Sequence, residues 1–223
     1  MFKSVFFKEW LKIRWAAAGV LIAFLLMLAY IYLNTSYYMR FIEPNGMWYN
    51  VVIRGMIFYG DLFIYLPLFA GILIGTTQFV PEISANRLKL TLHLPMKENV
   101  MLLTMLSIGT TALLIVYVIS YIILAIISTN FFPVEILWSL IITSLPWFLA
   151  GLIAYWAVAM ISIEILWLVR VALLVVFFGF VNLLFYLDTY NTYANSIVIF
   201  ILLSIFFAFQ TFLSAYRFRK GVL

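Results

Sequence analysis

Cysteine is absent from this sequence of 223 residues, and histidine occurs once, as His93. Without cysteine the chain has neither a disulfide framework nor a thiolate metal site, and a lone histidine is a poor start for another metal site. Charged residues are also scarce, at 9% of the chain against about 25% in an ordinary soluble domain. We therefore predict no metal site and exclude a water-soluble fold.

Motifs of the common catalytic sites are missing as well. The chain has no GxxxxGKS/T phosphate loop, no HExxH zinc motif and no GxSxG nucleophile turn. It therefore cannot hold nucleotide phosphates by itself in the usual way. We predict that the chain is not an enzyme, has no catalytic residues and binds no cofactor of its own.

Hydrophobic residues make up 67% of the chain and fall into six long runs, at residues 13–33, 57–79, 100–128, 136–162, 165–187 and 196–216. A helix of about 20 residues crosses a bilayer, and lipid offers no water to free backbone groups. The sequence therefore predicts an all-α polytopic membrane protein with six transmembrane helices, forming a single domain over residues 1–223. The fourth and fifth runs are separated by residues 162–164 alone, so a re-entrant hairpin is an alternative there.

The distribution of lysine and arginine predicts which side of the membrane each segment faces. If the N-terminus is cytoplasmic, eleven of the 13 basic residues lie inside, and Arg40 and Arg54 lie outside. Positive residues accumulate on the cytoplasmic side of membrane proteins, so both termini are predicted to be cytoplasmic. The net charge of +5 is then explained by attraction to anionic lipid headgroups, and no nucleic acid is expected as a partner.

The N-terminal segment, residues 1–12, has the pattern of an amphipathic interfacial helix. Apolar residues share one side at helical spacing, and lysines lie towards the flanks. Such a helix lies in the headgroup plane before the chain turns into the bilayer. Glu9 interrupts the apolar side, and it either pairs with a lysine or meets a partner protein. The alternative is a frayed extension of the first span.

Charged residues in or near the spans are functional candidates, because burying a charge in lipid is unfavourable. Asp61 follows Arg54 by seven residues, so the two share a face if the second helix begins near Arg54. They would then line an outward-facing cavity or form an interfacial pair that stabilises the helix entrance. Arg170 lies close enough to the cytoplasmic boundary for its long side chain to reach the headgroups.

Small residues predict close helix packing in the second span. Gly71 and Gly75 have the spacing of a close helix contact, and Pro67 frees a backbone carbonyl. Pro146 and Gly151 give the fourth span a weaker form of this pattern. We expect the second helix to pack tightly or to bend.

Residues 80–99, between the second and third spans, interrupt the apolar chain with charges, and the predicted topology places them in the cytoplasm. Pro81 suits a first helical turn and Glu82 suits the positive end of a helix dipole. A short helix is therefore expected over residues 81–89, followed by a leucine-rich return to the membrane. This loop either contacts a partner protein or is a solvated connector that the topology requires.

Three features of the chain together match a known layout. They are an N-terminal segment with Lys8, Glu9 and Trp10, six spans, and a loop in which an acid precedes a basic residue, spaced leucines and Leu-Pro. The loop residues are Glu82, Arg87, Leu88, Leu90, Leu92, Leu94 and Pro95. In this layout the chain resembles the ABC-2-type permeases, the membrane subunits of type V ABC exporters, although Asn86 stands where glycine is frequent in the family.

The resemblance implies a permease subunit of a bacterial ABC exporter in the cytoplasmic (inner) membrane, translocating an amphipathic or hydrophobic substrate. It implies a second permease copy or homologue in the lipid bilayer, and separate cytoplasmic ATPase subunits that hold ATP and Mg. Residues 80–99 would form the coupling loop beside the interfacial helix, with Glu82, Arg87, Leu88, Leu92, Leu94 and Pro95 as ATPase-coupling residues. The alternatives are an ion- or proton-coupled secondary carrier and a non-transporting membrane scaffold subunit.

Overall fold

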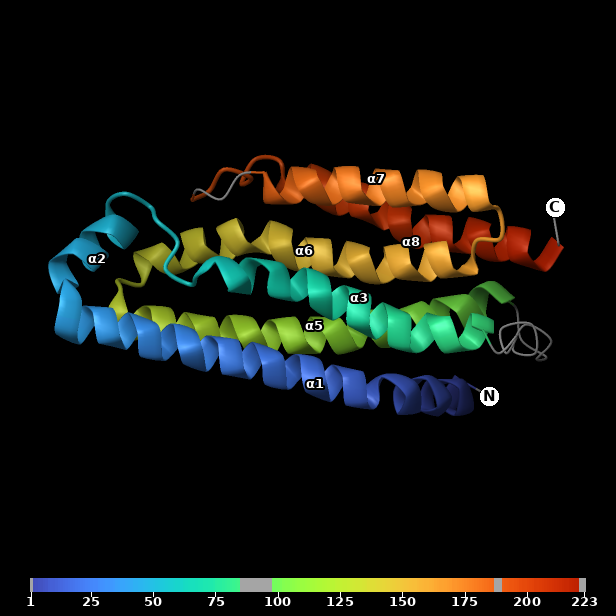
Figure 1. Cartoon of the computed structure of the whole chain (residues 1–223), viewed down its shortest axis with the longest axis horizontal. Helices are drawn as coiled ribbons and strands as arrows, with labels where there is room; N and C mark the ends of the chain where they lie inside the picture. The colour runs from blue at the N-terminus through green and yellow to red at the C-terminus, as the bar shows by residue number, and fades with distance from the viewer. Residues whose placement is uncertain (1, 85–97, 187–189, 221–223) are drawn as a thin grey trace.

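The computed structural model describes residues 2–84, 98–186 and 190–220. Within these ranges the chain is helical and has no strand, and six of the helices are long and apolar enough to cross a membrane. Their axes run along the long dimension of the molecule (Figure 1). For this part of the chain, the prediction of an all-α fold with six helices suited to crossing a membrane is confirmed.

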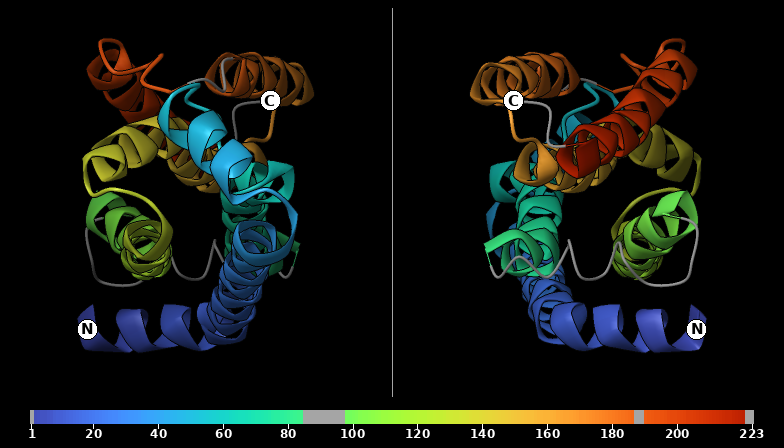
Figure 2. Two further views of the ribbon diagram at one scale, coloured as in Figure 1. Left: turned by 90° about the vertical axis from the view of Figure 1, so that its left-hand side faces the viewer. Right: turned by 90° about the vertical axis from the view of Figure 1, so that its right-hand side faces the viewer.

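The first helix, α1 (Phe2–Tyr37), continues without a break through the expected turn between the interfacial segment and the first span. Its beginning lies across the long axis of the bundle, and the rest runs along that axis (Figure 2). A short π-helical turn, η1 (Tyr38–Ile42), and a short helix, α2 (Pro44–Val52), then lead back towards the bundle.

The remaining spans are α3 (Asp61–Ser84), α5 (Glu98–Phe131), α6 (Glu135–Ile163), α7 (Trp167–Phe185) and α8 (Ile197–Lys220). α6 and α7 are separate helices joined at residues 164–166, where Glu164 takes an extended backbone conformation. Both helices are long and apolar enough to cross a membrane. The structure therefore favours two full spans over a re-entrant hairpin at this position. α1 begins and α8 ends at the same end of the bundle, which we call the terminal end (Figure 1).

The expected start of a new helix at Pro81 is wrong, because α3 runs through this residue, and residues 85–89 of the expected helix lie outside the described residues. Proline removes the hydrogen bond to the carbonyl of Thr77 but does not end the helix here. The next residue, Glu82, is fully buried and paired with Lys12, which holds the last turn of α3 in place.

α6 lies at the centre of the bundle and packs against α3, α5, α7 and α8. Its contact with α3 is unusually close, since a Cβ atom added to Gly71 would lie 1.9 Å from the backbone oxygen of Gly151. A Cβ atom on Gly151 would in turn lie 2.3 Å from the backbone oxygen of Pro67. The predicted close packing of the second span is therefore confirmed, and α6 is its partner.

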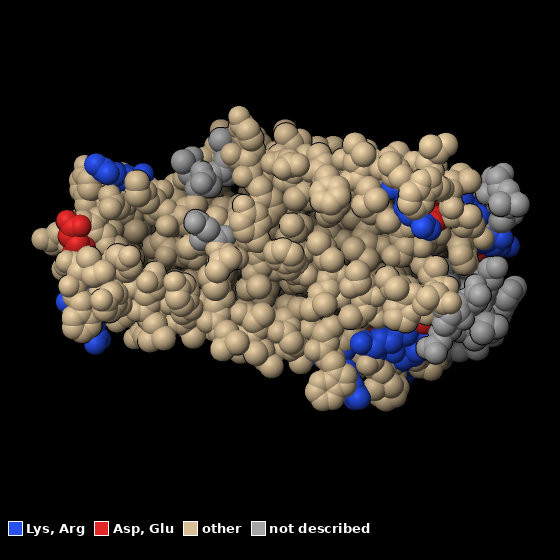
Figure 3. Space-filling model, viewed as in Figure 1, with Lys and Arg blue, Asp and Glu red and all other residues tan. Residues whose placement is uncertain are grey.

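Charged side chains gather towards the two ends of the bundle. On the face drawn in Figure 3, the surface between these ends carries no lysine, arginine, aspartate or glutamate. Exposed leucine, isoleucine, valine or phenylalanine side chains occur along α1, α3, α5, α7 and α8, whereas the central helix α6 exposes one large apolar side chain, Trp138. An uncharged band between two charged ends is the surface that a bilayer requires.

Candidate functional site

Two acids are fully buried where the beginning of α1 meets the end of α3. Lys12 lies between them, with its Nζ 2.5 Å from Glu9 Oε1 and also donating to Glu82 Oε1. Lys8 Nζ lies 3.1 Å from the same oxygen of Glu82 and 4.0 Å from Glu9 Oε1. Two carboxylates thus face two ammonium groups, which compensates charges that would otherwise be strongly unfavourable to bury.

Hydrogen bonds extend this arrangement into the bundle. Gln78 Nε2 donates to Glu9 Oε2 at 3.0 Å and to the backbone oxygen of Met105 at 2.8 Å. The hydroxyl of Tyr155 donates to Gln78 Oε1 at 2.8 Å. We call the side chains of Lys8, Glu9, Lys12, Gln78, Glu82 and Tyr155 the N-terminal cluster. Through it, α1, α3, α5 and α6 are joined at the terminal end.

A second cluster surrounds Glu164, which is fully buried between α6 and α7. Its Oε2 accepts hydrogen bonds from Ser214 Oγ at 2.8 Å and from Arg217 Nη1 at 3.1 Å. Its backbone oxygen accepts one from Arg170 Nη2. Nearby, Arg219 Nη1 lies 3.1 Å from Glu98 Oε2. These contacts tie α8 to the turn between α6 and α7 and to the start of α5.

The structure brings together three residues that the sequence singled out, Lys8, Glu9 and Glu82. Glu9 was expected either to pair with a lysine or to contact a partner protein, and the structure shows it paired with Lys12. Trp10 is exposed and lies outside the cluster. Glu82 is enclosed between helices, not presented on the rim of a loop. The other predicted coupling residues, Arg87, Leu88, Leu92, Leu94 and Pro95, lie outside the described residues.

The condition under which Arg54 and Asp61 would share a helix face is not met. α3 begins at Asp61, and Arg54 lies in the non-helical connection that precedes it. Gly55 and Gly60 have φ angles of 67° and 73°, a left-handed conformation that interrupts the helix. Arg54 instead places its guanidinium carbon 5.4 Å from the centre of the Tyr49 ring.

Several residues of the two clusters were not singled out from the sequence. They are Lys12, Gln78, Tyr155, Glu164, Ser214 and Arg217. A signal was present for Gln78 and Glu164, because a polar or acidic side chain at the end of an apolar run needs a partner inside the bundle. Tyr155 carries no such signal, since tyrosine is common in these runs.

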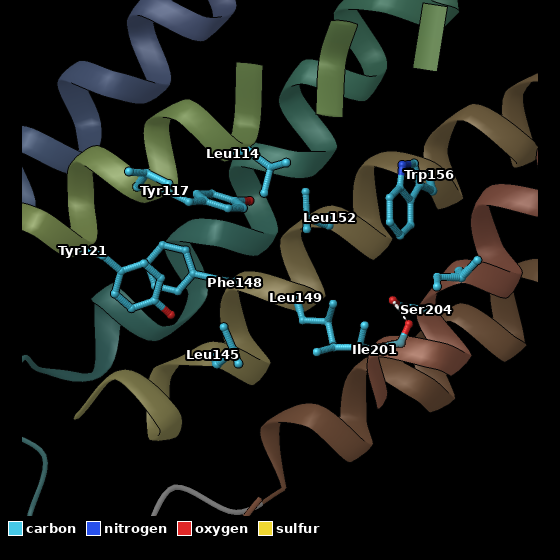
Figure 4. A pocket seen from close by; sticks show the side chains of 12 residues that line it. Leu114, Tyr117, Tyr121, Leu145, Phe148, Leu149, Leu152, Trp156, Ile201 and Ser204 are labelled. Carbon is cyan, nitrogen blue, oxygen red and sulfur yellow. Dashed lines mark hydrogen bonds between the residues drawn. The ribbon is translucent and has the colours of Figure 1, made fainter. Parts of the chain in front are cut away.

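An apolar groove of about 330 Å³ lies between α5, α6 and α8. In Figure 4, leucine and aromatic side chains of α5 and α6 face Ile201 and Ser204 of α8 across it. The polar groups of its wall bond within the chain: Tyr117 with Pro67, Tyr121 with Ser144, Trp156 with Thr110 and Ser204 with Ile201. The groove therefore suits a hydrocarbon surface and offers few groups to a polar ligand.

Among the described residues, no group of three or more acidic or histidine side chains could hold a metal ion. Comparison of the chain with protein-family models, curated protein sequences and solved structures finds no match. The layout of the sequence, the two clusters and the groove are therefore the features that bear on function.

Proposed function

We propose that this chain is the membrane-spanning permease subunit of a bacterial ABC exporter. The observation that carries the proposal is the N-terminal cluster, because it joins the two segments that the resemblance assigns to the ATPase contact. Glu82, at the start of residues 80–99, pairs with Lys8 and Lys12 of α1. Force applied to either segment would therefore act on both helices together.

The same cluster leads from the terminal end to the apolar groove. Glu82 is joined through Lys12 and Glu9 to Gln78, and Gln78 accepts a hydrogen bond from Tyr155. The next residue of α6, Trp156, lines the groove. A displacement of α3 by the ATPase would thus shift α6 and change the shape of the groove. An amphipathic or hydrophobic substrate is the class that such a wall accepts.

The remaining parts of the proposal follow from the resemblance and the charge distribution. The exporter contains a second permease copy or homologue and cytoplasmic ATPase subunits that bind ATP and Mg. It lies in the bacterial cytoplasmic membrane with both termini inside, and the beginning of α1 lies in the headgroup plane. A proton- or ion-coupled carrier is less well supported, because the buried acids of the described residues lie at the terminal end and are paired.

Co-purification with an ATPase tests this proposal directly. The chain should form a stable complex with a separate ABC ATPase subunit and should hydrolyse no ATP alone, since it lacks a phosphate loop. Within the complex, Tyr155→Phe should leave assembly intact but lower substrate-stimulated hydrolysis, because it breaks the link to Gln78. Tyr190→Phe is the matched control, since that hydroxyl has no hydrogen-bond partner among the described residues. ATP hydrolysis by the pure chain would contradict the proposal.

The proposed orientation predicts which exposed positions react from outside the cell. Asn45 lies in the first turn of α2, and Asn45→Cys should be labelled by an impermeant thiol reagent in intact cells. Lys3→Cys, at the beginning of α1, should be labelled after permeabilisation only. The native chain has no cysteine, so the background is low. The reverse pattern would place both termini outside.

A further inference from the structure

Arg170 differs from the other partly buried charges of the described residues. Each of those has an ion-pair partner; they are Lys8, Glu9, Lys12, Glu82, Glu98, Glu164 and Arg217. Arg170 has none within the described part of the chain, although it lies in the first turn of a spanning helix. Charged side chains in spanning helices pair with opposite charges or with backbone carbonyls, so an anionic ligand is a favourable partner for Arg170.

The guanidinium of Arg170 is only partly satisfied by the protein. Its one described hydrogen bond runs from Nη2 to the backbone oxygen of Glu164, and its buried Nε has no partner. The carboxylate of Glu164 is bound by Ser214 and Arg217. Arg170 therefore keeps donors for a ligand that the described residues do not supply.

A pocket of about 320 Å³, lined in part by Arg170, lies at the terminal end of the bundle. It lies between the last turn of α3 and the ends of α6 and α7 that adjoin their connection. Its wall consists of Val80, Ile83, Ser84, Ile161, Ser162 and Arg170. The hydroxyl of Ser162 has no hydrogen-bond partner among the described residues and provides a second donor. The pocket thus combines a cation and a hydroxyl donor with three aliphatic side chains.

The surrounding charge favours an anion from outside the chain. Residues 85–97, which follow Ser84, contain Arg87, Lys89 and Lys97 and no acidic residue. Wherever these residues lie, they supply no carboxylate to Arg170. The N-terminal end of α7 adds the positive end of a helix dipole next to this side chain.

We propose that this pocket binds the phosphate group of an anionic phospholipid. Arg170 would donate charge-assisted hydrogen bonds to the phosphate oxygens, for which a guanidinium is well shaped, and Ser162 would donate a further one. The aliphatic wall would contact the beginning of an acyl chain, which a free phosphate ion lacks. Basic pockets between membrane helices on the cytoplasmic side commonly hold lipid headgroups. This site requires a membrane location but does not depend on the proposed transport activity.

Lipid binding to the purified full chain tests the assignment. Native mass spectrometry with phosphatidylglycerol and with phosphatidylcholine should show preferential retention of the anionic lipid. Arg170→Gln should weaken that retention roughly tenfold or more, the loss expected for a charge-assisted hydrogen bond. Arg40→Gln, an exposed arginine at the opposite end, should leave it unchanged. Equal losses in the two variants would mean general charge attraction and would overturn the proposal.

Two further measurements distinguish lipid binding in this pocket from binding of a soluble anion. Ser162→Leu narrows the pocket without removing the arginine, and it should also weaken retention while the protein elutes as a folded species. This keeps the test decisive if Arg170→Gln does not fold. Inorganic phosphate should not compete at millimolar concentration, because it lacks an acyl chain. Competition by phosphate that depends on Arg170 would identify a soluble anion site and overturn the lipid assignment.

Discussion

Replacing Lys12 by methionine is expected to lower the free energy of unfolding by about 3–5 kcal/mol, because it removes the nearest cation of buried Glu9 and one of the two lysines that pair with buried Glu82. Glu9 and Glu82 are both fully buried, and Lys12 contacts each of them. Lys8 is 4.0 Å from the nearer oxygen of Glu9, so it replaces the lost cation poorly. No other single substitution in the N-terminal cluster removes a counter-charge from both acids so directly.

Thermal unfolding in mild detergent measures this effect. A loss of this size corresponds to a decrease of roughly 6–20 °C in Tm for a domain of this length. Lys3→Met is the control, because Lys3 is exposed and should shift Tm little. The triple variant Glu9→Gln, Lys12→Met and Glu82→Gln should recover much of the stability, since it removes the buried charges together. If Lys12→Met unfolds at the same temperature as Lys3→Met, the cluster does not stabilise the bundle.

Gly71→Ala is expected to destabilise the bundle by about 3 kcal/mol, at the upper end of the usual range for overpacking. The added methyl group would lie 1.9 Å from the backbone oxygen of Gly151, and a backbone atom cannot rotate away. α3 and α6 must therefore separate along their contact. Gly75→Ala should have a smaller effect, because its methyl group would meet the movable side chain of Val158 at 2.9 Å.

Gly19→Ala and Gly179→Ala are the matched controls for this experiment. Neither added methyl group meets an atom within 4 Å, so stability should be equal or slightly higher, as alanine favours the helix. The same detergent-based thermal assay compares all four variants. Equal Tm values for Gly71→Ala and Gly19→Ala would contradict the close contact between α3 and α6.

The six spans could be predicted because the requirement that lipid imposes is local to each segment. The close contact of the second span was visible for a related reason, since Gly71 and Gly75 mark a helix face by their spacing alone. In contrast, the position of Arg54 depends on Gly55 and Gly60, whose left-handed conformations end any continuation of the helix. Sequence spacing assumes one unbroken helix and cannot show such an interruption.

The N-terminal cluster could be predicted in part only, because its members are distant in sequence. Glu9 suggested a lysine partner, but nothing in the local pattern showed that Lys12 also contacts Glu82, 70 residues further on. This contact changes how Glu82 is interpreted. Substituting it disturbs a buried pair as well as any contact with an ATPase, so Tyr155→Phe is the cleaner test of coupling.

The pairing of Lys8 and Lys12 with Glu82 implies two successive roles for these lysines during synthesis of the protein. A chain is made from its N-terminus, so α1 emerges while Glu82 is still absent. In the proposed orientation, the four basic side chains and one acidic side chain of the first 14 residues would then favour the cytoplasmic side. When α3 follows, Glu82 neutralises part of this charge. The same lysines would thus first orient the nascent chain and later hold its first two spans together.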